Sequence, residues 1–142
     1  MDKTRTTARI LIVEDDGIIA CNLQRMVAKL GYEVVGAVPS GEEAIQKAKE
    51  ERPSLVLMDV SLAGKLNGVE AAVQIQARSN VPVIFLTGYA RDVLFQGVEV
   101  SGSYIYLNKP VYERALGDAI EEMFAGHTTT NGERNESQIG ER

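Results

Sequence analysis

Residues 55–60, LVLMDV, place four apolar side chains directly before an aspartate, Asp59. An apolar run of this kind is typical of a strand that is buried on both faces of a sheet. Because an ionised carboxylate is costly to remove from water, the position of Asp59 at the end of such a strand needs a physical reason. Considered alone, this aspartate is as well explained by a turn or by the N-cap of a following helix as by a functional site.

Apolar runs and helical patterns alternate along the chain on both sides of this stretch. The predicted strands are 10–13, 32–38, 54–59, 81–87 and 103–107. Apolar residues at helical spacing predict helices at 19–30, 40–52, 67–79, 92–100 and 115–124. Strands that alternate with helices indicate an α/β protein, in which a doubly wound parallel sheet of five strands is covered by five helices.

Helix boundaries and one cysteine provide further predictions. Asp16 directly precedes the first helical pattern and suits an N-cap, and Gly31 supplies the stop at the other end. Ser40 and Glu43 have the spacing of a capping box at the start of the second helix. The single Cys21 lies in the first helical pattern, so we expect it to be a small hydrophobic residue of the core.

Composition and charge narrow the class of protein. The chain has 142 residues, of which 44% are hydrophobic and 25% charged, so one globular domain is expected. A net charge of −5 without a basic tract weighs against binding to nucleic acid or to a membrane surface. No segment is apolar enough for a signal peptide or a membrane span, so a cytoplasmic location is expected. We expect a flexible N-terminus at 1–7, a folded domain at 8–124, and a disordered polar tail at 125–142 in which His127 has no catalytic role.

Functional side chains lie at the ends of most of the predicted strands. Glu14 and Asp15 follow the first strand, Asp59 and Thr87 end the third and fourth, and Lys109 follows the fifth. In a doubly wound sheet, ligands bind where the carboxyl ends of the strands meet. If the first and third strands are neighbours, their carboxylates would repel one another unless a cation joined them. A hard divalent ion suits oxygen ligands, and Mg²⁺ fits best because it also accepts phosphate oxygens.

This set of groups points to phosphoryl transfer. A carboxylate beside Mg²⁺ and a lysine can attack phosphorus and form an aspartyl phosphate. The metal ion and the ammonium group would offset the charge on the transferred phosphoryl oxygens. We therefore interpret Asp59 as a residue that its buried strand holds rigidly in a site, where Mg²⁺ and Lys109 offset its charge.

Four segments in register also carry a resemblance to a known family. They are ILIVEDD at 10–16, LVLMDVSL followed by NGVEAA at 55–72, PVIFLTGYA at 82–90 and YIYLNKP at 104–110. In this order and at these intervals they resemble the receiver domain of bacterial two-component response regulators, over about 8–124. The resemblance implies a flavodoxin-like fold with strand order 2-1-3-4-5.

The resemblance also implies roles for residues at matching positions. Asp59 would be the phosphoacceptor. Asp15 and Asp59 would bind Mg²⁺ directly, together with the backbone carbonyl of Ser61, and Glu14 would act through a water molecule. Lys109 would contact the phosphoryl group.

A second set of matching positions implies a switch and control of its lifetime. The hydroxyl of Thr87 would move onto a phosphoryl oxygen and Tyr106 would turn inward, which together make a two-state element. The peptide bond before Pro110 would be cis. Ser61 and Tyr89 would flank the phosphoryl group and limit the access of water, so a Tyr89→Ala variant is expected to dephosphorylate itself faster.

The implied function is that of a stand-alone receiver with no output domain after Phe124. A sensor histidine kinase would phosphorylate it, and it would act on a downstream protein through protein contacts, with a phosphorylation-dependent homodimer left open. No enzymatic activity is expected beyond its own phosphorylation and dephosphorylation. Alternatively, the chain is a phosphorelay intermediate that passes the group to a histidine phosphotransfer protein, and the residues do not distinguish the two. A Mg²⁺-dependent phosphatase of the haloacid dehalogenase type is disfavoured, because Ser61 stands where that chemistry needs a second acid.

Overall fold

Five parallel strands form one sheet in the order β2-β1-β3-β4-β5. This description comes from a computed structural model, which describes residues 7–88, 100 and 102–126. The strands are β1 (Arg9–Val13), β2 (Glu33–Val38), β3 (Leu55–Asp59), β4 (Val83–Thr87) and β5 (Tyr104–Asn108). The predicted flavodoxin-like order is confirmed, and β1 and β3 are direct neighbours.

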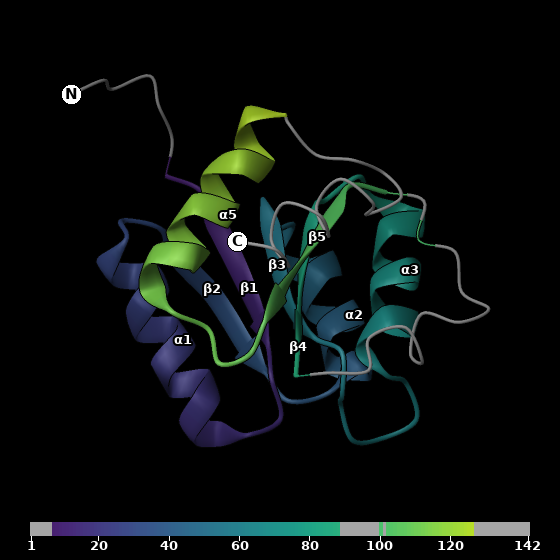
Figure 1. Ribbon diagram of the computed structural model, residues 1–142. Coiled ribbons are helices and arrows are strands. Elements are labelled where there is room, and N and C mark those ends of the chain that lie inside the picture. Colours follow the sequence, from purple (N-terminus) through teal and green to yellow (C-terminus); the bar gives the residue numbers. More distant parts are fainter. Residues whose placement is uncertain (1–6, 89–99, 101, 127–142) are drawn as a thin grey trace.

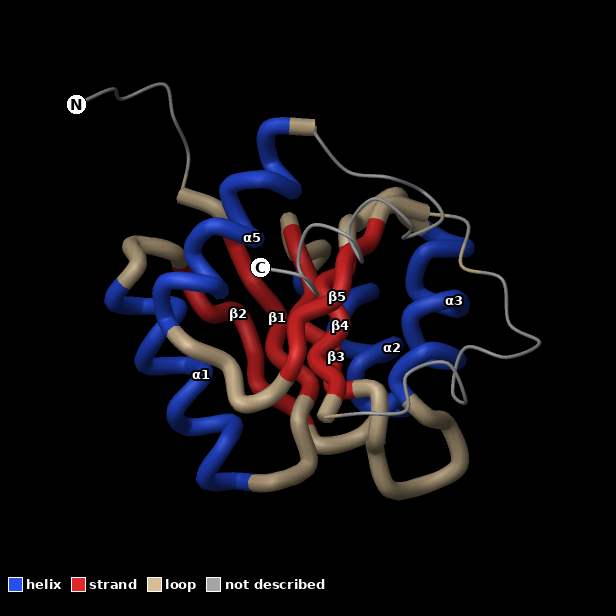
Figure 2. The backbone as a smooth tube through the Cα atoms, viewed as in Figure 1, coloured by secondary structure: helices blue, strands red, loops and turns tan. Residues whose placement is uncertain are grey.

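Four helices lie within the described residues and cover both faces of the sheet. They are α1 (Gly17–Lys29), α2 (Gly41–Glu51), α3 (Gly68–Arg78) and α5 (Glu113–Ala125). Helices α1 and α5 pack on one face, and α2 and α3 pack on the other (Figures 1 and 2). The helix predicted at 92–100 falls almost entirely outside the described residues, and so does the tail from 127 onward. None of the described helices combines the length and apolar character that a membrane span requires.

The two faces of the sheet bury two separate hydrophobic clusters, which explains the uniformly apolar strands. Ile10 and Ile12 of β1 pack with residues of α1 and α5, whereas Leu11 and Val13 pack with residues of α2 and α3. Every residue of β3 and β4 is buried. Since side chains alternate between the faces of a strand, a strand covered on both sides must be apolar at consecutive positions. The only polar residues of β3 and β4, Asp59 and Thr87, are also buried and are the last residues of these strands.

Two of the three cap predictions are confirmed and one needs correction. The Asp16 side chain accepts hydrogen bonds from the backbone N–H groups of the next helix, at 2.9 and 3.1 Å. Gly31 lies just past α1 with φ +98°, a conformation that favours glycine. Ser40 caps α2, but the carboxylate of Glu43 accepts from the Ser40 hydroxyl instead of completing a capping box. The reciprocal box forms at Asn67 and Glu70, at the start of α3.

The prediction that Cys21 belongs to the core is wrong, because its side chain is exposed. The buried residues of α1 are Leu23 and Val27. Successive residues of a helix are rotated by about 100°, so Cys21 lies roughly 160° around the helix from Leu23. Helical spacing placed the cysteine in the right element but on the face that points away from the sheet.

Candidate functional site

The register of the sheet brings the acidic ends of β1 and β3 to the same level. Val13 pairs with Met58, so the next residues of the two strands, Glu14 and Asp59, are neighbours across the sheet. The backbone N–H of Glu14 donates to the carbonyl of Val38 at 3.0 Å, which holds this turn against β2. The convergence of the two strand ends that the sequence predicted is therefore confirmed.

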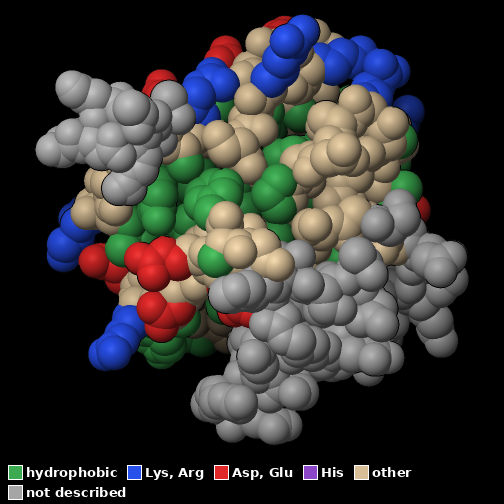
Figure 3. Space-filling model, turned by 90° about the horizontal axis from the view of Figure 1, so that it is seen from above, with side chains coloured by type: hydrophobic (Ala, Val, Ile, Leu, Met, Phe, Trp, Pro, Cys, Tyr) green, Lys and Arg blue, Asp and Glu red, His purple; other side chains and the backbone are tan. Residues whose placement is uncertain are grey.

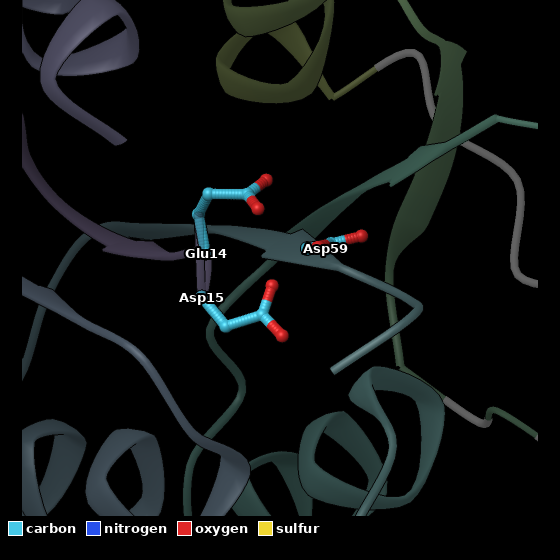
Figure 4. Close-up of side chains that lie close together, drawn as sticks. All are labelled: Glu14, Asp15 and Asp59. Carbon is cyan, nitrogen blue, oxygen red and sulfur yellow. The ribbon is translucent and has the colours of Figure 1, made fainter. Parts of the chain in front are cut away.

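Three carboxylates meet at this edge of the sheet. Glu14, Asp15 and Asp59 each offer an oxygen atom, and these atoms lie within 4.8 Å of one another. Glu14 and Asp59 are only 3% and 2% exposed, whereas Asp15 is exposed. Figure 4 shows the three carboxyl groups projecting to the same side from the ends of β1 and β3. The cluster thus combines two buried carboxyl groups with a third that solvent reaches.

Lys109 supplies the positive charge that faces these acids. Its Nζ lies 3.0 Å from Oδ1 of Asp59 and 3.6 Å from Oε1 of Glu14. Its backbone N–H donates to the carbonyl of Thr87 at 2.8 Å, so the end of β5 is fixed against the end of β4. The peptide bond between Lys109 and Pro110 is cis, as the resemblance implies. Burial lowers the pKa of Lys109, but the hydrogen bond and charge of Asp59, together with Glu14, outweigh it and leave this pKa above its usual value.

One ammonium group does not satisfy the acidic cluster. Burial raises the pKa of Glu14 to about 7; the hydrogen bond from the N–H of Asp16 opposes this shift, and the charge of Asp59 reinforces it. Oε1 of Glu14 is buried and has no hydrogen-bond partner among the described residues. Converging carboxylate oxygens, one of them buried without a hydrogen bond from any described residue, are the kind of ligands that Mg²⁺ prefers. The residues therefore fit a divalent cation bound at this cluster.

The connection from β3 to α3 is tied to the acids by backbone groups. The N–H of Ser61 donates to Oδ1 of Asp59, and the N–H of Ala63 donates to Oδ2 of Asp15, both at 3.1 Å. Ser61 was a predicted site residue; the anchoring contact of Ala63 was not predicted. A backbone donor carries no side-chain signal, so only the path of the loop reveals it.

Gly68 is a second residue that sequence reasoning missed. It begins α3 directly beneath the strand end, and its N–H donates to the carbonyl of Val60 at 3.0 Å. A Cβ atom built on Gly68 would lie 2.0 Å from the carbonyl oxygen of Asp59, closer than any real contact. Only glycine allows the helix to approach the end of β3 this closely. The position of Asp59 thus depends on a residue without a side chain.

The remaining predicted residues fall near the same edge, with one exception. Thr87 is fully buried at the end of β4, and its register partner on β5 is Asn108. Tyr106 is half-buried and lies edge-on to Tyr104, with ring centroids 5.9 Å apart. Tyr89 lies outside the described residues.

Comparison with known proteins agrees with this geometry. Residues 10–121 match the response regulator receiver domain. The chain belongs to this family. Receiver domains are generally non-catalytic signalling domains of two-component systems, and they interact with histidine kinases and with downstream proteins.

Individual relatives share the receiver part of their chains with this protein. The transcriptional regulatory protein PdtaR of Mycobacterium tuberculosis is 35% identical over 113 residues, which cover 80% of this chain and 55% of PdtaR. The phyllosphere-induced regulator PhyR of Methylorubrum extorquens is 41% identical over 86 residues, 60% of this chain and 32% of its own. The chain thus spans about half or less of the length of these curated relatives.

Solved structures show the same domain. The signal receiver domain of a modulated diguanylate cyclase from Desulfovibrio desulfuricans superposes with a TM-score of 0.73 at 39% identity, over 82% of this chain and 92% of that one. A receiver domain protein from Methanospirillum hungatei superposes with a TM-score of 0.74 at 29% identity, over 85% and 96% of the two chains.

Proposed function

We propose that this chain accepts a phosphoryl group from a histidine kinase on Asp59 and transmits the change through protein contacts. The observation that carries the proposal is the contact of 3.0 Å between Nζ of Lys109 and Oδ1 of a buried Asp59, at the centre of three converging carboxylates. A cap or turn role for Asp59 needs neither the lysine nor the other acids. A phosphoacceptor needs both.

The metal site of the proposal uses the residues already assembled there. Asp15 and Asp59 would hold Mg²⁺ directly, with the backbone carbonyl of Ser61, and Glu14 would act through a water molecule. When bound, Mg²⁺ would offset negative charge on the phosphoryl oxygens as the group is transferred. Oε1 of Glu14, which is buried and accepts no hydrogen bond from the described residues, and the raised pKa of Glu14 support a cation at this position.

The transfer itself is a substitution at phosphorus. An oxygen of the Asp59 carboxylate forms a bond to phosphorus while the bond between phosphorus and the donor imidazole nitrogen breaks. The electron pair of the breaking bond leaves with the imidazole. The strand end and the N–H of Ser61 hold the Asp59 carboxylate in place, and Lys109 supplies positive charge where the phosphoryl oxygens arrive.

The readout of phosphorylation would be a switch made by Thr87 and Tyr106. Thr87 is buried at the edge where the phosphoryl group would stand, and Tyr106 lies two positions before the register partner of Thr87. A hydroxyl that moves onto the phosphoryl oxygen leaves space that the half-buried tyrosine ring can enter. We also retain the proposal that Ser61 and Tyr89 limit the access of water to the phosphoryl group.

Incubation of the protein with acetyl phosphate and Mg²⁺, followed by intact-mass spectrometry, tests the proposal. One phosphate per chain is expected, and none in an Asp59→Asn variant. Asp118→Asn on the exposed side of α5 is the matched control and should be labelled like the unsubstituted protein. Labelling that persists in Asp59→Asn, or that does not need Mg²⁺, would contradict the assignment.

A further inference from the structure

A second chemically distinctive region lies between the C-terminal ends of α2 and α3. There, a cavity of about 520 Å³ is lined by three cationic side chains, Lys49, Arg52 and Arg78, and by apolar side chains that include Ile45, Ile75 and Val81. We call it the basic cavity. Figure 3 views the molecule from the end at which the strands begin, and Lys and Arg side chains gather along the upper edge of this view.

The basic cavity is separate from the acidic site. Arg52 precedes the first residue of β3 by three positions, and Val81 precedes the first residue of β4 by two. Asp59 stands at the other end of β3, roughly 13 Å further along a strand that rises about 3.3 Å per residue. The two regions thus occupy opposite edges of one sheet.

The cations of the basic cavity have no acidic partner within the described part of the chain. No ion pair or side-chain hydrogen bond involves Lys49, Arg52 or Arg78 among those residues. Nearby Arg9 differs, because it pairs with Glu51 at 2.9 Å and also donates to the carbonyls of Glu51 and Arg52. These carbonyls end α2, and Arg9 offsets much of the negative charge that they would otherwise present.

A lysine or arginine in the last turn of a helix interacts favourably with the helix dipole. This alone would explain Lys49 at the end of α2 and Arg78 at the end of α3. It does not explain the cavity that these side chains line or the apolar residues of its lining. Ile75 and Val81 are almost fully buried, at 3% and 7% exposure, and with the half-buried Ile45 they form the apolar lining of a volume in the size range of small-molecule sites. Three cations without an acidic partner among the described residues, next to apolar side chains, favour a ligand that has both an anionic and an apolar part.

We propose that the basic cavity binds a small organic anion, in which a negatively charged group is attached to an apolar ring or chain. The apolar part would lie on Ile45, Ile75 and Val81, and the anionic group would meet the guanidinium groups of Arg52 and Arg78. Guanidinium groups suit this role because they present several donors in one plane to an oxyanion. This proposal does not depend on phosphorylation of Asp59.

Binding of 8-anilinonaphthalene-1-sulfonate to the full chain, in buffer without Mg²⁺, tests the proposal. A sulfonate does not donate phosphoryl groups, so the acidic site takes no part in the measurement. We expect saturable fluorescence enhancement with one dye per chain, and amide chemical-shift changes confined to 45–53 and 75–81. N-phenyl-1-naphthylamine has the same apolar rings without the sulfonate and should bind at least about tenfold more weakly, since it lacks the charged hydrogen bonds.

Two substitutions identify the cations. Arg52→Asn and Arg78→Gln should each weaken binding of the sulfonated dye about tenfold, and should leave the binding of the neutral dye unchanged. Asparagine is chosen because Arg52 has φ +48°, which asparagine tolerates. Arg25→Gln on the exposed surface of α1 removes one positive charge elsewhere and should have no effect.

Asp59→Asn should bind the dye like the unsubstituted protein, so the test is independent of the proposed phosphorylation. Cooperative thermal unfolding of each variant shows that a loss of binding is not a loss of fold. The proposal is overturned if the two dyes bind equally, if Arg25→Gln weakens binding as much as Arg78→Gln, or if the shift changes lie elsewhere.

Discussion

The two edges of this sheet are built from the same strands but by different means. At the carboxyl edge, acids at the ends of β1 and β3 meet one lysine, and backbone groups of the following loop hold them. At the amino edge, three cations and an apolar floor come from the ends of two helices, far apart in the sequence. Topology brings strand ends together, so the first site could be foreseen. The second depends on how two helices pack.

The two edges also differ in what surrounds a glycine: backbone atoms at the carboxyl edge, and a side chain at the amino edge. At Gly68 an added Cβ would meet backbone atoms of Asp59 and Val60, which cannot move without shifting the strand end. At Gly102 an added Cβ would meet the end of the Gln76 side chain, at 2.5 Å. Gln76 donates to the carbonyls of Val81 and Ser103, so it links α3 to the starts of β4 and β5 through a movable side chain. We infer that the carboxyl edge is rigid and the amino edge adaptable.

The largest expected effect is therefore that of Gly68→Ala. Because backbone must give way, we expect the free energy of unfolding to fall by about 3 kcal/mol, at the upper end of what overpacking costs. Gly102→Ala should cost only about 1 kcal/mol, the loss of one or two hydrogen bonds of Gln76. Urea unfolding at pH 7 compares the two, and similar losses would contradict the difference between the edges.

The fold was predictable because its signals are local and repeated. Uniformly apolar strands ending in Asp59 or Thr87 indicated a sheet covered on both faces, and the acidic cluster followed once β1 and β3 were neighbours. The exposure of Cys21 was not foreseen, because spacing identifies a helix more readily than the limits of its buried face. The contacts of Ala63 and Gly68 could not be foreseen either, since both use backbone atoms whose positions depend on the loop.

The next effect concerns the pH dependence of the carboxyl edge in metal-free buffer. The pKa of Glu14 is raised from 4.5 to about 7, so between these values the folded state holds a proton that the unfolded state has released. The free energy of unfolding should therefore fall as pH rises through this range. The loss from this residue is on the order of 3 kcal/mol and is complete above the folded pKa.

Glu14→Gln removes the titrating group and should flatten this dependence, which chemical unfolding at several pH values with a chelator present can measure. The variant is expected to be more stable than the unsubstituted protein at pH 8 and similar to it at pH 4. If the free energy of unfolding depended on pH equally in both proteins, Glu14 would not be the group responsible for the dependence.

The smallest expected effect is stabilisation by Mg²⁺, which should act at the carboxyl edge alone. A cation that binds only the folded state raises the free energy of unfolding by about 2 kcal/mol when its free concentration is roughly thirty times Kd. At the same Mg²⁺ concentration, Asp15→Asn should lose most of this gain. Its amide oxygen can still accept the hydrogen bond from Ala63, so the loop keeps its anchor while the metal loses a charged ligand.

Asp16→Asn is the matched control for the metal, one residue further along. Its side chain caps α1 through hydrogen bonds to the N–H groups of Ile18 and Ile19, and asparagine caps equally well. This variant should therefore keep both its stability and its response to Mg²⁺, although it loses the same charge as Asp15→Asn. If Mg²⁺ stabilised the two variants equally, general screening of an acidic surface would explain the effect, and the carboxyl edge would have no specific cation site.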